Sequence, residues 1–451
     1  YENVNFAGSS VRTYKLQTEN SLGDESLTIA FTAAADAETT LQPSVNGKSL
    51  TPAMTLSPIG TYIYATSATK TFDVSKLKSE DNTWNVKLAS TSGHDARLDY
   101  LALHYSRLLA TPCSDGYCAF QGEDSGDVEY QIVGNPDNTL VLRIGSCEEK
   151  TALMQTEVKG DATLGFTVRN SQSRYVAIDL SHSFPEPAWM GKVENQDLHA
   201  LDSLDMVIIV PASGKLMQQA QRLADAHLQY DNMKVGVVRA DQVYNEFSSG
   251  TPDATAYRRF VKMLYDRGTS SGTAPRYLLL MGDCAWDNRM QSTAWRMFNP
   301  DDYLLCYESE NSVSDTKSYV MEDYFGLMDD GEGGSLLKDK SDLGIGRFPV
   351  TSAAEAKILV DKSILHMSNR YAGPWKNLVC FLGDDGDENE HMKYADDVAE
   401  RGIAQNPEIE VKKIMWDTYK RVSTAKNNTY PEVTTLLKKY MNDGALVMNY
   451  T

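Results

Sequence analysis

The chain has 451 residues, of which 41% are apolar and 23% charged, and its formal net charge is −19. That length suits two to four domains with separate cores, and the composition is typical of an ordinary globular protein. The acidic balance, without a basic patch, argues against a nucleic-acid partner, and no segment approaches the ~18 apolar residues of a membrane span. The first residue is Tyr1 rather than Met, as expected of a chain that has lost a signal segment.

Residues 1–195 consist of short alternating segments separated by Gly, Pro, Asn, Asp and Ser. Apolar and polar side chains that alternate over five to eight residues are typical of half-buried strands. We expect such strands at 61–67, 98–105, 138–145 and 175–180. No helical pattern longer than about two turns interrupts them. Residues 1–195 are therefore predicted to form an all-β sandwich of jelly-roll-like type.

The cysteines are spread along the chain, at Cys113, Cys118, Cys147, Cys284, Cys306 and Cys380. A zinc site needs a second closely spaced Cys/His pair, which the sequence lacks. In an oxidising compartment Cys113 can pair with Cys118, or one of the two with Cys147. Of the other three, Cys284 and Cys380 are expected to be structural, as small buried residues.

From residue 200 onward, buried strands alternate with amphipathic helices. The expected strands are 205–211, 233–238, 276–283, 343–350, 377–385, 410–416 and 444–450, and the expected helices are 214–230, 253–268, 353–366, 390–401 and 431–442. Asp253 is the expected N-cap and Gly268 the expected C-cap of the helix 253–268. Apolar runs of this kind are typical of parallel strands buried on both faces. The alternation predicts an α/β doubly wound, mainly parallel sheet for residues 200–451.

Three of these strands end in polar residues, at Asp283, at Asp384-Asp385 and at 449–451. In doubly wound sheets ligands bind outside the carboxyl ends of the strands. We therefore expect these three strand ends to form one rim around a functional site.

Several segments resemble the gingipain-type cysteine peptidases, family C25, and occur in the family's order. They are "LDYLALHYSRLL" (98–109), "VYNEFSSGTPDATAYRRFVKMLYDR" (243–267), "YLLLMGD" (277–283), "EDYFGLMDDGEG" (322–333), "LGIGRFPV" (343–350), "VCFLGDDGDENEH" (379–391) and "GALVMNYT" (444–451). The likeness is greatest to the surface protease of the type IX secretion system of Bacteroidetes. It implies a caspase/gingipain-like fold for the second region.

In this family the strand that matches 446–451 is followed directly by Gly-His-Gly, whose His is the catalytic base, and later by the nucleophilic Cys. The resemblance therefore implies that both residues lie beyond Thr451, and that the peptidase domain is incomplete and inactive in the chain as given. A thiol attacks an amide only as the thiolate, which a neighbouring His generates.

The resemblance assigns an orienting role to Asp385, which matches the acid that faces the catalytic His. Such an acid holds the imidazole in one tautomer and stabilises its charged form. Glu388 matches an acidic position that selects basic substrate side chains. Asp384 and Asp385 also suit a helix cap, and His391 is expected to pack against these acids.

The resemblance further implies a structural calcium ion, bound by Asp283, the Met328 carbonyl, Asp330 (or Asp329) and Asp342. Carboxylates beside Gly-rich backbone, as in "MDDGEGG" (328–334), provide the hard oxygen ligands that calcium requires.

The implied function is that of an exported cysteine endopeptidase at the outer-membrane surface. It would remove C-terminal secretion signals from exported proteins and join the new terminus to lipopolysaccharide, together with other type IX secretion components. Two alternatives remain open. One is a metal-dependent α/β phosphatase with Asp384, Asp385 and Asp387 around magnesium, and the other is a non-catalytic surface binding module.

Overall fold

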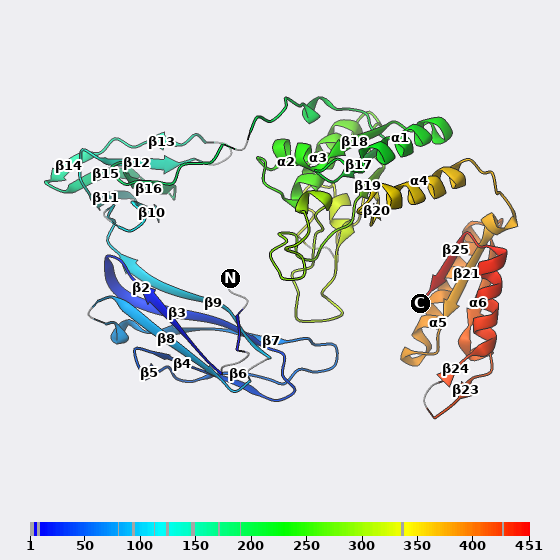
Figure 1. Ribbon diagram of the computed structural model, residues 1–451, viewed down its shortest axis with the longest axis horizontal. Helices are drawn as coiled ribbons and strands as arrows, with labels where there is room; N and C mark the ends of the chain where they lie inside the picture. The colour runs from blue at the N-terminus through cyan, green and yellow to red at the C-terminus, as the bar shows by residue number, and fades with distance from the viewer. Residues whose placement is uncertain are drawn as a thin grey trace. The chain divides into compact units, whose positions relative to one another are not determined.

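The computed structural model describes residues 1–451 except 1–3, 7–9, 80, 93–94, 112, 123–125, 146–148, 170–171, 190, 335–337 and 426–427. The chain divides into two compact units (Figure 1). The first consists of Tyr1–Asn195 and Glu308–Val320, and the second of Gln196–Tyr307 and Met321–Thr451.

The first unit begins with two antiparallel sheets that share one core. One sheet has the order β1-β9-β3-β7, and the other has β2-β8-β4-β5, with β6 also paired to β4. The core includes alternate residues of β3, β4, β8 and β9, because side chains in a strand point to opposite faces in turn. The strands are β1 Val4–Asn5, β2 Val11–Gln17, β3 Ser21–Ala33, β4 Thr39–Val45, β5 Lys48–Ser49, β6 Met54–Leu56, β7 Thr66–Asp73, β8 Thr83–Ser90 and β9 Ala96–Arg107.

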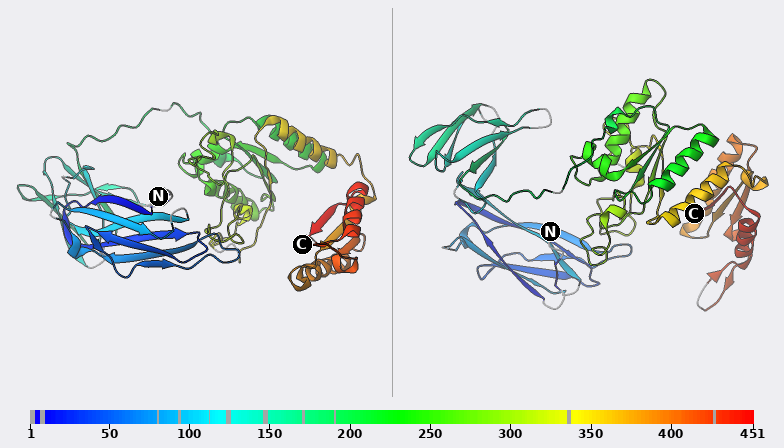
Figure 2. Two further views of the ribbon diagram at one scale, coloured as in Figure 1. Left: turned by 60° about the horizontal axis from the view of Figure 1, so that its bottom comes forward. Right: turned by 45° about the horizontal axis from the view of Figure 1, so that its top comes forward.

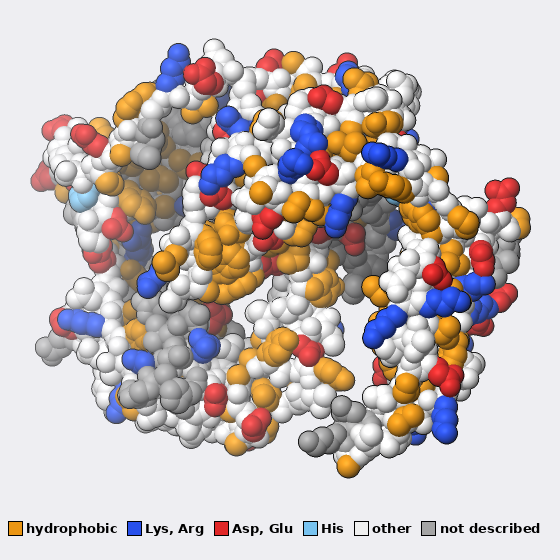
Figure 3. All heavy atoms as spheres, turned by 45° about the vertical axis from the view of Figure 1, so that its right-hand side comes forward, with side chains coloured by type: hydrophobic (Ala, Val, Ile, Leu, Met, Phe, Trp, Pro, Cys, Tyr) orange, Lys and Arg blue, Asp and Glu red, His pale blue; other side chains and the backbone are white. Residues whose placement is uncertain are grey.

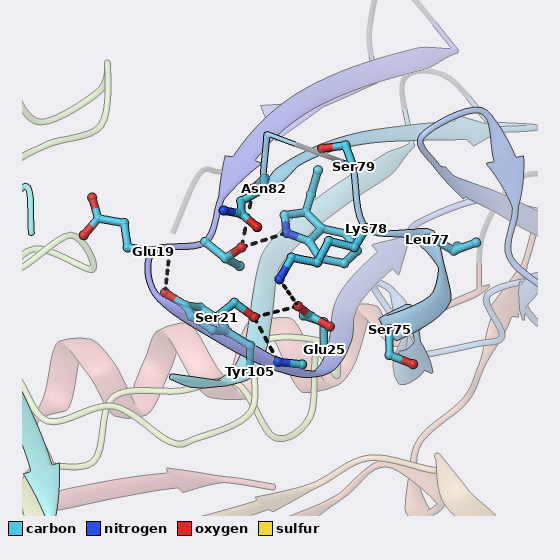
Figure 4. A network of polar contacts seen from close by, with 12 residues as sticks. Glu19, Ser21, Glu25, Ser75, Leu77, Lys78, Ser79, Asn82 and Tyr105 are labelled. Carbon is cyan, nitrogen blue, oxygen red and sulfur yellow. Dashed lines mark hydrogen bonds and ion pairs between the residues drawn. The ribbon is translucent and has the colours of Figure 1, made fainter. Parts of the chain in front are cut away.

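A charged network lies at one end of this sandwich (Figure 4). The Glu25 side chain is only 1% exposed. Its Oε1 accepts a hydrogen bond from Ser21 Oγ at 2.7 Å and lies 3.3 Å from Lys78 Nζ. Burial alone would raise the pKa of Glu25, but hydrogen bonds, beginning with that from Ser21, and the Lys78 charge outweigh it and lower the pKa. The carboxylate is therefore held in its charged form.

We expect Glu25→Gln to lower the free energy of unfolding at neutral pH by about 1–2 kcal/mol, because it removes hydrogen bonds to a charged group. A lowered pKa in the folded state gives stability that is present above the unfolded-state pKa, and that is lost as pH falls through the folded value. Urea unfolding at pH 7 and below pH 4.5 should show a smaller acid-induced loss in Glu25→Gln than in wild type. The exposed Glu38→Gln should behave like wild type, and equal acid sensitivity in all three proteins would contradict the prediction.

A second pair of antiparallel sheets follows, with a core of its own. The orders are β10-β16-β12-β13 and β11-β15-β14. The core gathers Ile132, Val141, Phe166, Tyr175 and Ala177. The strands are β10 Tyr117–Gln121, β11 Asp127–Val133, β12 Thr139–Ile144, β13 Ala152–Leu153, β14 Glu157–Gly160, β15 Thr163–Arg169 and β16 Arg174–Asp179. The predicted all-β character is confirmed, and residues 1–195 contain two pairs of sheets where the sequence suggested one sandwich.

The first unit is completed by the segment Glu308–Val320, which is far away in sequence. Its ends pair with each other through a bridge between Glu308 and Val320, and its middle forms an antiparallel bridge from Ser314 to Ile63. The Tyr64 amide donates to the Val313 carbonyl at 2.8 Å. The predicted strand 61–67 is wrong for this reason: β7 starts only at Thr66, and the residues before it pair with the inserted segment.

The second unit begins with a parallel sheet in the order β18-β17-β19-β20. Its strands are β17 Met206–Val210, β18 Val235–Arg239, β19 Tyr277–Met281 and β20 Gly344–Phe348. Helices α1 Met217–Asp231 and α4 Ala353–Met367 contribute to the core on one face, and α2 Ala240–Phe247, α3 Ala254–Thr269 and the 3-10 turn η4 Glu322–Gly326 to the core on the other. Every residue of β17 is buried, as expected for a strand covered on both faces.

A separate parallel sheet, in the order β22-β21-β25, ends the chain. It consists of β21 Leu378–Gly383, β22 Glu410–Met415 and β25 Val447–Tyr450, with α5 Glu390–Gln405 and α6 Pro431–Asp443 as connecting helices and the short hairpin β23 Val422–Ser423 and β24 Asn428–Thr429. The α/β region is therefore confirmed, but the single sheet that the sequence suggested is two sheets. The helix α2 was not predicted.

The N-cap of α3 is confirmed, because the Asp253 carboxylate accepts a hydrogen bond from the Thr255 amide at 2.8 Å. The predicted C-cap at Gly268 is wrong, since the helix continues to Thr269. A Cβ on Gly268 would lie 2.4 Å from the Ala274 amide nitrogen, so the glycine instead permits a close approach of the returning backbone.

Candidate functional site

The polar rim of the second parallel sheet is formed by β21 and β25, which lie side by side. Leu382 pairs with Tyr450, and the Thr451 amide donates to the Leu382 carbonyl at 3.0 Å. The left view of Figure 2 shows β25, in red, ending at the marked C-terminus. The structure thus brings 449–451 beside Asp384 and Asp385. Asp283 follows β19 in the other sheet, so the predicted rim of three strand ends is wrong.

Asp384 connects three segments of this rim. Its Oδ1 lies 2.6 Å from His391 Nδ1 at the start of α5, and its Oδ2 accepts a hydrogen bond from the Tyr450 hydroxyl at 2.6 Å. The hydrogen bond from Tyr450, aided by His391, lowers the pKa of Asp384. The same contacts raise the pKa of Tyr450 to about 12 and that of His391 above its ordinary value. The expected packing of His391 against the acids is confirmed.

Asp385 makes its contacts with other elements. Its Oδ2 accepts a hydrogen bond from the Tyr430 hydroxyl, just before α6, at 2.5 Å, and Arg421 Nη1 lies 3.7 Å away. The Asp385 side chain is 32% exposed, and the hydrogen bond to it raises the pKa of Tyr430. Neighbouring residues thus face different partners: Asp384 binds β25 and α5, whereas Asp385 faces Tyr430 and Arg421. Its role as an orienting acid stays a prediction.

Glu388 lies on the loop that connects this rim to α5. It is exposed, and its φ is +56°, between Asp387 at +46° and Asn389 at +66°. Non-glycine residues in the left-handed region cost about 1 kcal/mol or more each. Three in succession give a sharply turned loop that presents Glu388 to solvent. Its predicted role in selecting basic side chains stays a prediction.

The described cysteines are all free thiols. Cys113 and Cys118 are therefore not paired with each other, and pairing with Cys147 falls outside the described residues. Cys380 is buried, as predicted, and Cys306 is buried too. Cys284 is only half-buried, and a hydrogen bond with Cys306, aided by the Arg347 charge, lowers its pKa to about 7. It lies just after β19, in the sheet that does not contain Asp384.

The four predicted calcium ligands do not come together as one set. Tyr277 pairs with Gly344 and Met281 with Phe348, so Asp283 follows the carboxyl end of β19 while Asp342 precedes the amino end of β20. At about 3.3 Å per residue, the two carboxylates are roughly 15 Å or more apart. Lys262 Nζ binds the oxygen atoms of the other two predicted ligands: it donates to the Met328 carbonyl at 2.8 Å and lies 3.0 Å from Asp330 Oδ1. The set Asp283, Met328, Asp330 and Asp342 is therefore wrong as one site.

Three carboxylates do meet, and two of them, of Asp342 and of the alternative ligand Asp329, belong to the predicted calcium ligands. Oxygen atoms of Asp329, Glu332 and Asp342 lie within 4.8 Å of one another. The Asp342 carboxylate also accepts a hydrogen bond from the Met328 amide at 2.9 Å, and that of Glu332 accepts one from the Asp329 amide at 3.1 Å. These bonds hold the loop that contains the three side chains. Three carboxylates at this spacing suit a hard cation with loose geometry.

Among the described residues, the face in Figure 3 shows no single acidic or basic patch. On the face shown in Figure 3, Asp and Glu side chains lie scattered among Lys and Arg. Among the helices of the described residues, none combines the length and the apolar character needed to cross a bilayer.

Comparison with solved structures identifies similar proteins. The dimeric latent PorU from Porphyromonas gingivalis superposes with a TM-score of 0.71 at 28% sequence identity, over 83% of this chain and 37% of that chain. The chain thus spans little more than a third of the length of that protein. A structure described as a protease covers 55% of this chain at 16% identity, with a TM-score of 0.36 that is too low to support an argument. No curated protein matches the chain significantly.

A family model extends these findings to the sequence. The model of peptidase family C25 matches residues 199–451, which is more than half of the chain and contains both parallel sheets. The antiparallel sheets followed by parallel α/β sheets are the PorU/gingipain-like fold. The chain belongs to peptidase family C25.

Proposed function

We propose that the chain is the N-terminal part of a PorU-like cysteine endopeptidase of the cell surface, which removes C-terminal secretion signals from exported proteins. The main support is the 28% identity to PorU over 83% of the chain. A match of this length extends beyond the α/β region into the β-region. Export to the outer-membrane surface, exported proteins as substrates, contact with other type IX secretion components and transfer of the new terminus to lipopolysaccharide belong to the same proposal.

The chemistry of this proposal centres on the rim of β21 and β25. The backbone of Thr451 lies beside the strand end that leads into Asp384 and Asp385. Residues that continue β25 would bring a His to this rim, and a thiol from the next strand would be deprotonated by it. A partly shielded carboxylate at Asp385 would then orient the imidazole and stabilise its protonated form.

The test uses the encoded protein extended beyond Thr451. It is incubated with a reporter protein fused to a C-terminal secretion signal, and the new C-terminus is identified by mass spectrometry. We expect cleavage that prior alkylation with iodoacetamide abolishes, and none by the chain that ends at Thr451. Cleavage that survives alkylation, or cleavage by the shorter chain, would contradict the proposal.

We also propose that calcium binds at Asp329, Glu332 and Asp342. Calcium is then expected to raise the melting temperature of the chain, since a ligand that binds only the folded state stabilises it. Asp342→Asn should remove this rise. Asp283→Asn, at the opposite end of the same sheet, should retain it. Melting curves that do not respond to calcium or to a chelator would remove the site.

The phosphatase alternative gains no support from the geometry. It requires Asp384, Asp385 and Asp387 around magnesium, but the first two carboxylates bind the hydroxyls of Tyr450 and Tyr430. Among the described residues, the group of carboxylates close enough to share a cation lies elsewhere. A purely binding role for the β-region remains a separate proposal, and the cleavage test above distinguishes it.

A further inference from the structure

The two parallel sheets share one strand order. In each, the first strand in sequence lies between the second and the third: β18-β17-β19 in one sheet and β22-β21-β25 in the other (Figure 1). Where the chain leaves two adjacent strands in opposite directions, a crevice opens outside their carboxyl ends, and ligands bind there. Asp384 and Asp385 lie at this point of the second sheet. The proposed function assigns nothing to the equivalent point of the first sheet, outside β17 and β19.

A cavity of about 620 Å³ lies at that point. Its wall includes Ala212, two residues after β17, Ala240, immediately after β18, and Ala285, four residues after β19. Ligand pockets usually have volumes of about 300–1,000 Å³. Small side chains stand at the three strand ends, and the loop after β19, residues 285–305, supplies most of the remaining wall.

The wall is mainly apolar and has charges at its edge. Met290 and Leu304 are both buried core residues, and the hydroxyl of Tyr244 is bound to that of Tyr257. Two carboxylates, of Asp253 and Asp301, also line the cavity, against the single guanidinium of Arg289. Such a wall suits a large apolar group, and the excess of negative charge favours a cation beside it.

The apolar surface continues outside the cavity. Tyr303, which lines it, packs edge-on against Trp295 at 5.7 Å and Phe298 at 6.1 Å between ring centroids. On the same loop the side chains of Trp286 and Met297 are 64% and 88% exposed. Exposed apolar groups gathered next to a pocket mark a surface for a partner. This apolar surface extends beyond the part of the wall that a small ligand inside the cavity could contact.

We propose that this cavity binds a polypeptide through one large apolar side chain, with an adjacent Lys or Arg held by Asp301 and Asp253. The identification of the occupant as a polypeptide rests on the proposed function, because a peptidase of exported proteins meets such chains as its substrates. The site is a second contact for the substrate, apart from the rim at Asp384 and Asp385. Anchoring a remote part of the substrate raises its local concentration at the reactive centre.

The test is direct binding to the 451-residue chain, read without cleavage. The probe is Gly-Phe-Lys-Gly-Gly-amide with fluorescein on its N-terminal amine, which leaves the Lys side chain charged, and the readout is fluorescence anisotropy. We expect saturable binding that Ala212→Leu, which fills the cavity, weakens at least about tenfold. Asp301→Asn should weaken binding about threefold and reduce its salt dependence. Ala354→Leu, the same change at an exposed position of α4, should bind like wild type.

Several outcomes would overturn the proposal. They are the absence of saturable binding to wild type, equal binding by Ala212→Leu and wild type, and displacement by N-acetyl-phenylalaninamide as effective as by unlabelled peptide. If circular dichroism shows Ala212→Leu unfolded, the salt dependence of Asp301→Asn decides. Peptide binding by the 451-residue chain together with no cleavage by the protein extended beyond Thr451 would reject the proposed function and support this site. Cleavage by the extended protein without peptide binding would reject this site alone.

Discussion

Asp385→Ala, in the protein extended beyond Thr451, is expected to lower kcat on the order of tenfold to ten-thousandfold while KM changes little. The reason is that an acid beside the imidazole acts on the transition state, where the ring becomes charged, more than on substrate binding. In the structure this carboxylate is 32% exposed and contacts Tyr430 and Arg421, whereas His391 contacts Asp384. Steady-state kinetics on a signal-bearing reporter measures the effect.

The pH profile separates an orienting role from a merely structural one. Loss of an acid that stabilises imidazolium should shift the acidic limb of kcat/KM to lower pH, because the ring then loses its proton more easily. Asp384→Ala is expected to affect the melting temperature more than kcat, since it releases Tyr450 and His391. The control is Asp387→Asn, because the Asp387 side chain is exposed. A larger loss of kcat in Asp384→Ala than in Asp385→Ala would move the orienting role to Asp384.

The second large effect is expected at Arg347, whose side chain is only 10% exposed. Its Nε donates to Glu322 Oε1 at 2.8 Å, and its other nitrogens donate to the carbonyls of Gly282 and Leu305 at 3.0 and 3.1 Å. One guanidinium thus ties β20 to η4, to the end of β19 and to the loop that returns from it. Arg347→Ala should lower the free energy of unfolding of the second unit by about 3–5 kcal/mol, because it leaves the partly buried Glu322 carboxylate and two backbone carbonyls without the guanidinium.

Guanidinium chloride unfolding of the whole chain measures this change. The matched control is Arg276→Ala, since Arg276 is 60% exposed and pairs with Asp205 at 3.2 Å on the surface. Such a pair contributes about 0–1 kcal/mol. Arg347→Lys should fall between the two, because it keeps the charge and loses the fork geometry. Equal losses for Arg347→Ala and Arg276→Ala would contradict the prediction.

The sequence predicted the classes of structure well, because they depend on local periodicity. The apolar run of β17 and the helix cap Asp253 both depend on residues close together in sequence, and both are confirmed. The grouping of the strands into two sheets could not be predicted in this way. Which strand pairs with which depends on contacts between segments far apart, and every parallel strand has the same apolar pattern.

The same limit explains the outcome at the candidate sites. His391 lies seven residues after Asp384, at the start of α5. Their contact could therefore be anticipated from the sequence alone. The calcium set required Asp283 and Asp342 at the same end of the sheet, and only the register of β19 and β20 shows that they are at opposite ends. Lys262 reaches Met328 from 66 residues away, and no local pattern contains that contact.

The segment Glu308–Val320 has a consequence for the order in which the protein folds. The first unit includes this segment, although the stretch 196–307 of the second unit is synthesised before it. Domains usually fold in the order in which they are made, from the N-terminus onward. Here the backbone amides of Tyr64 and Ala65 donate to the Val313 carbonyl, which becomes available only when residue 313 has emerged. During synthesis the first unit is therefore complete only after residues 308–320 have emerged, whereas the chain before that segment is already free to form β17, β18 and β19.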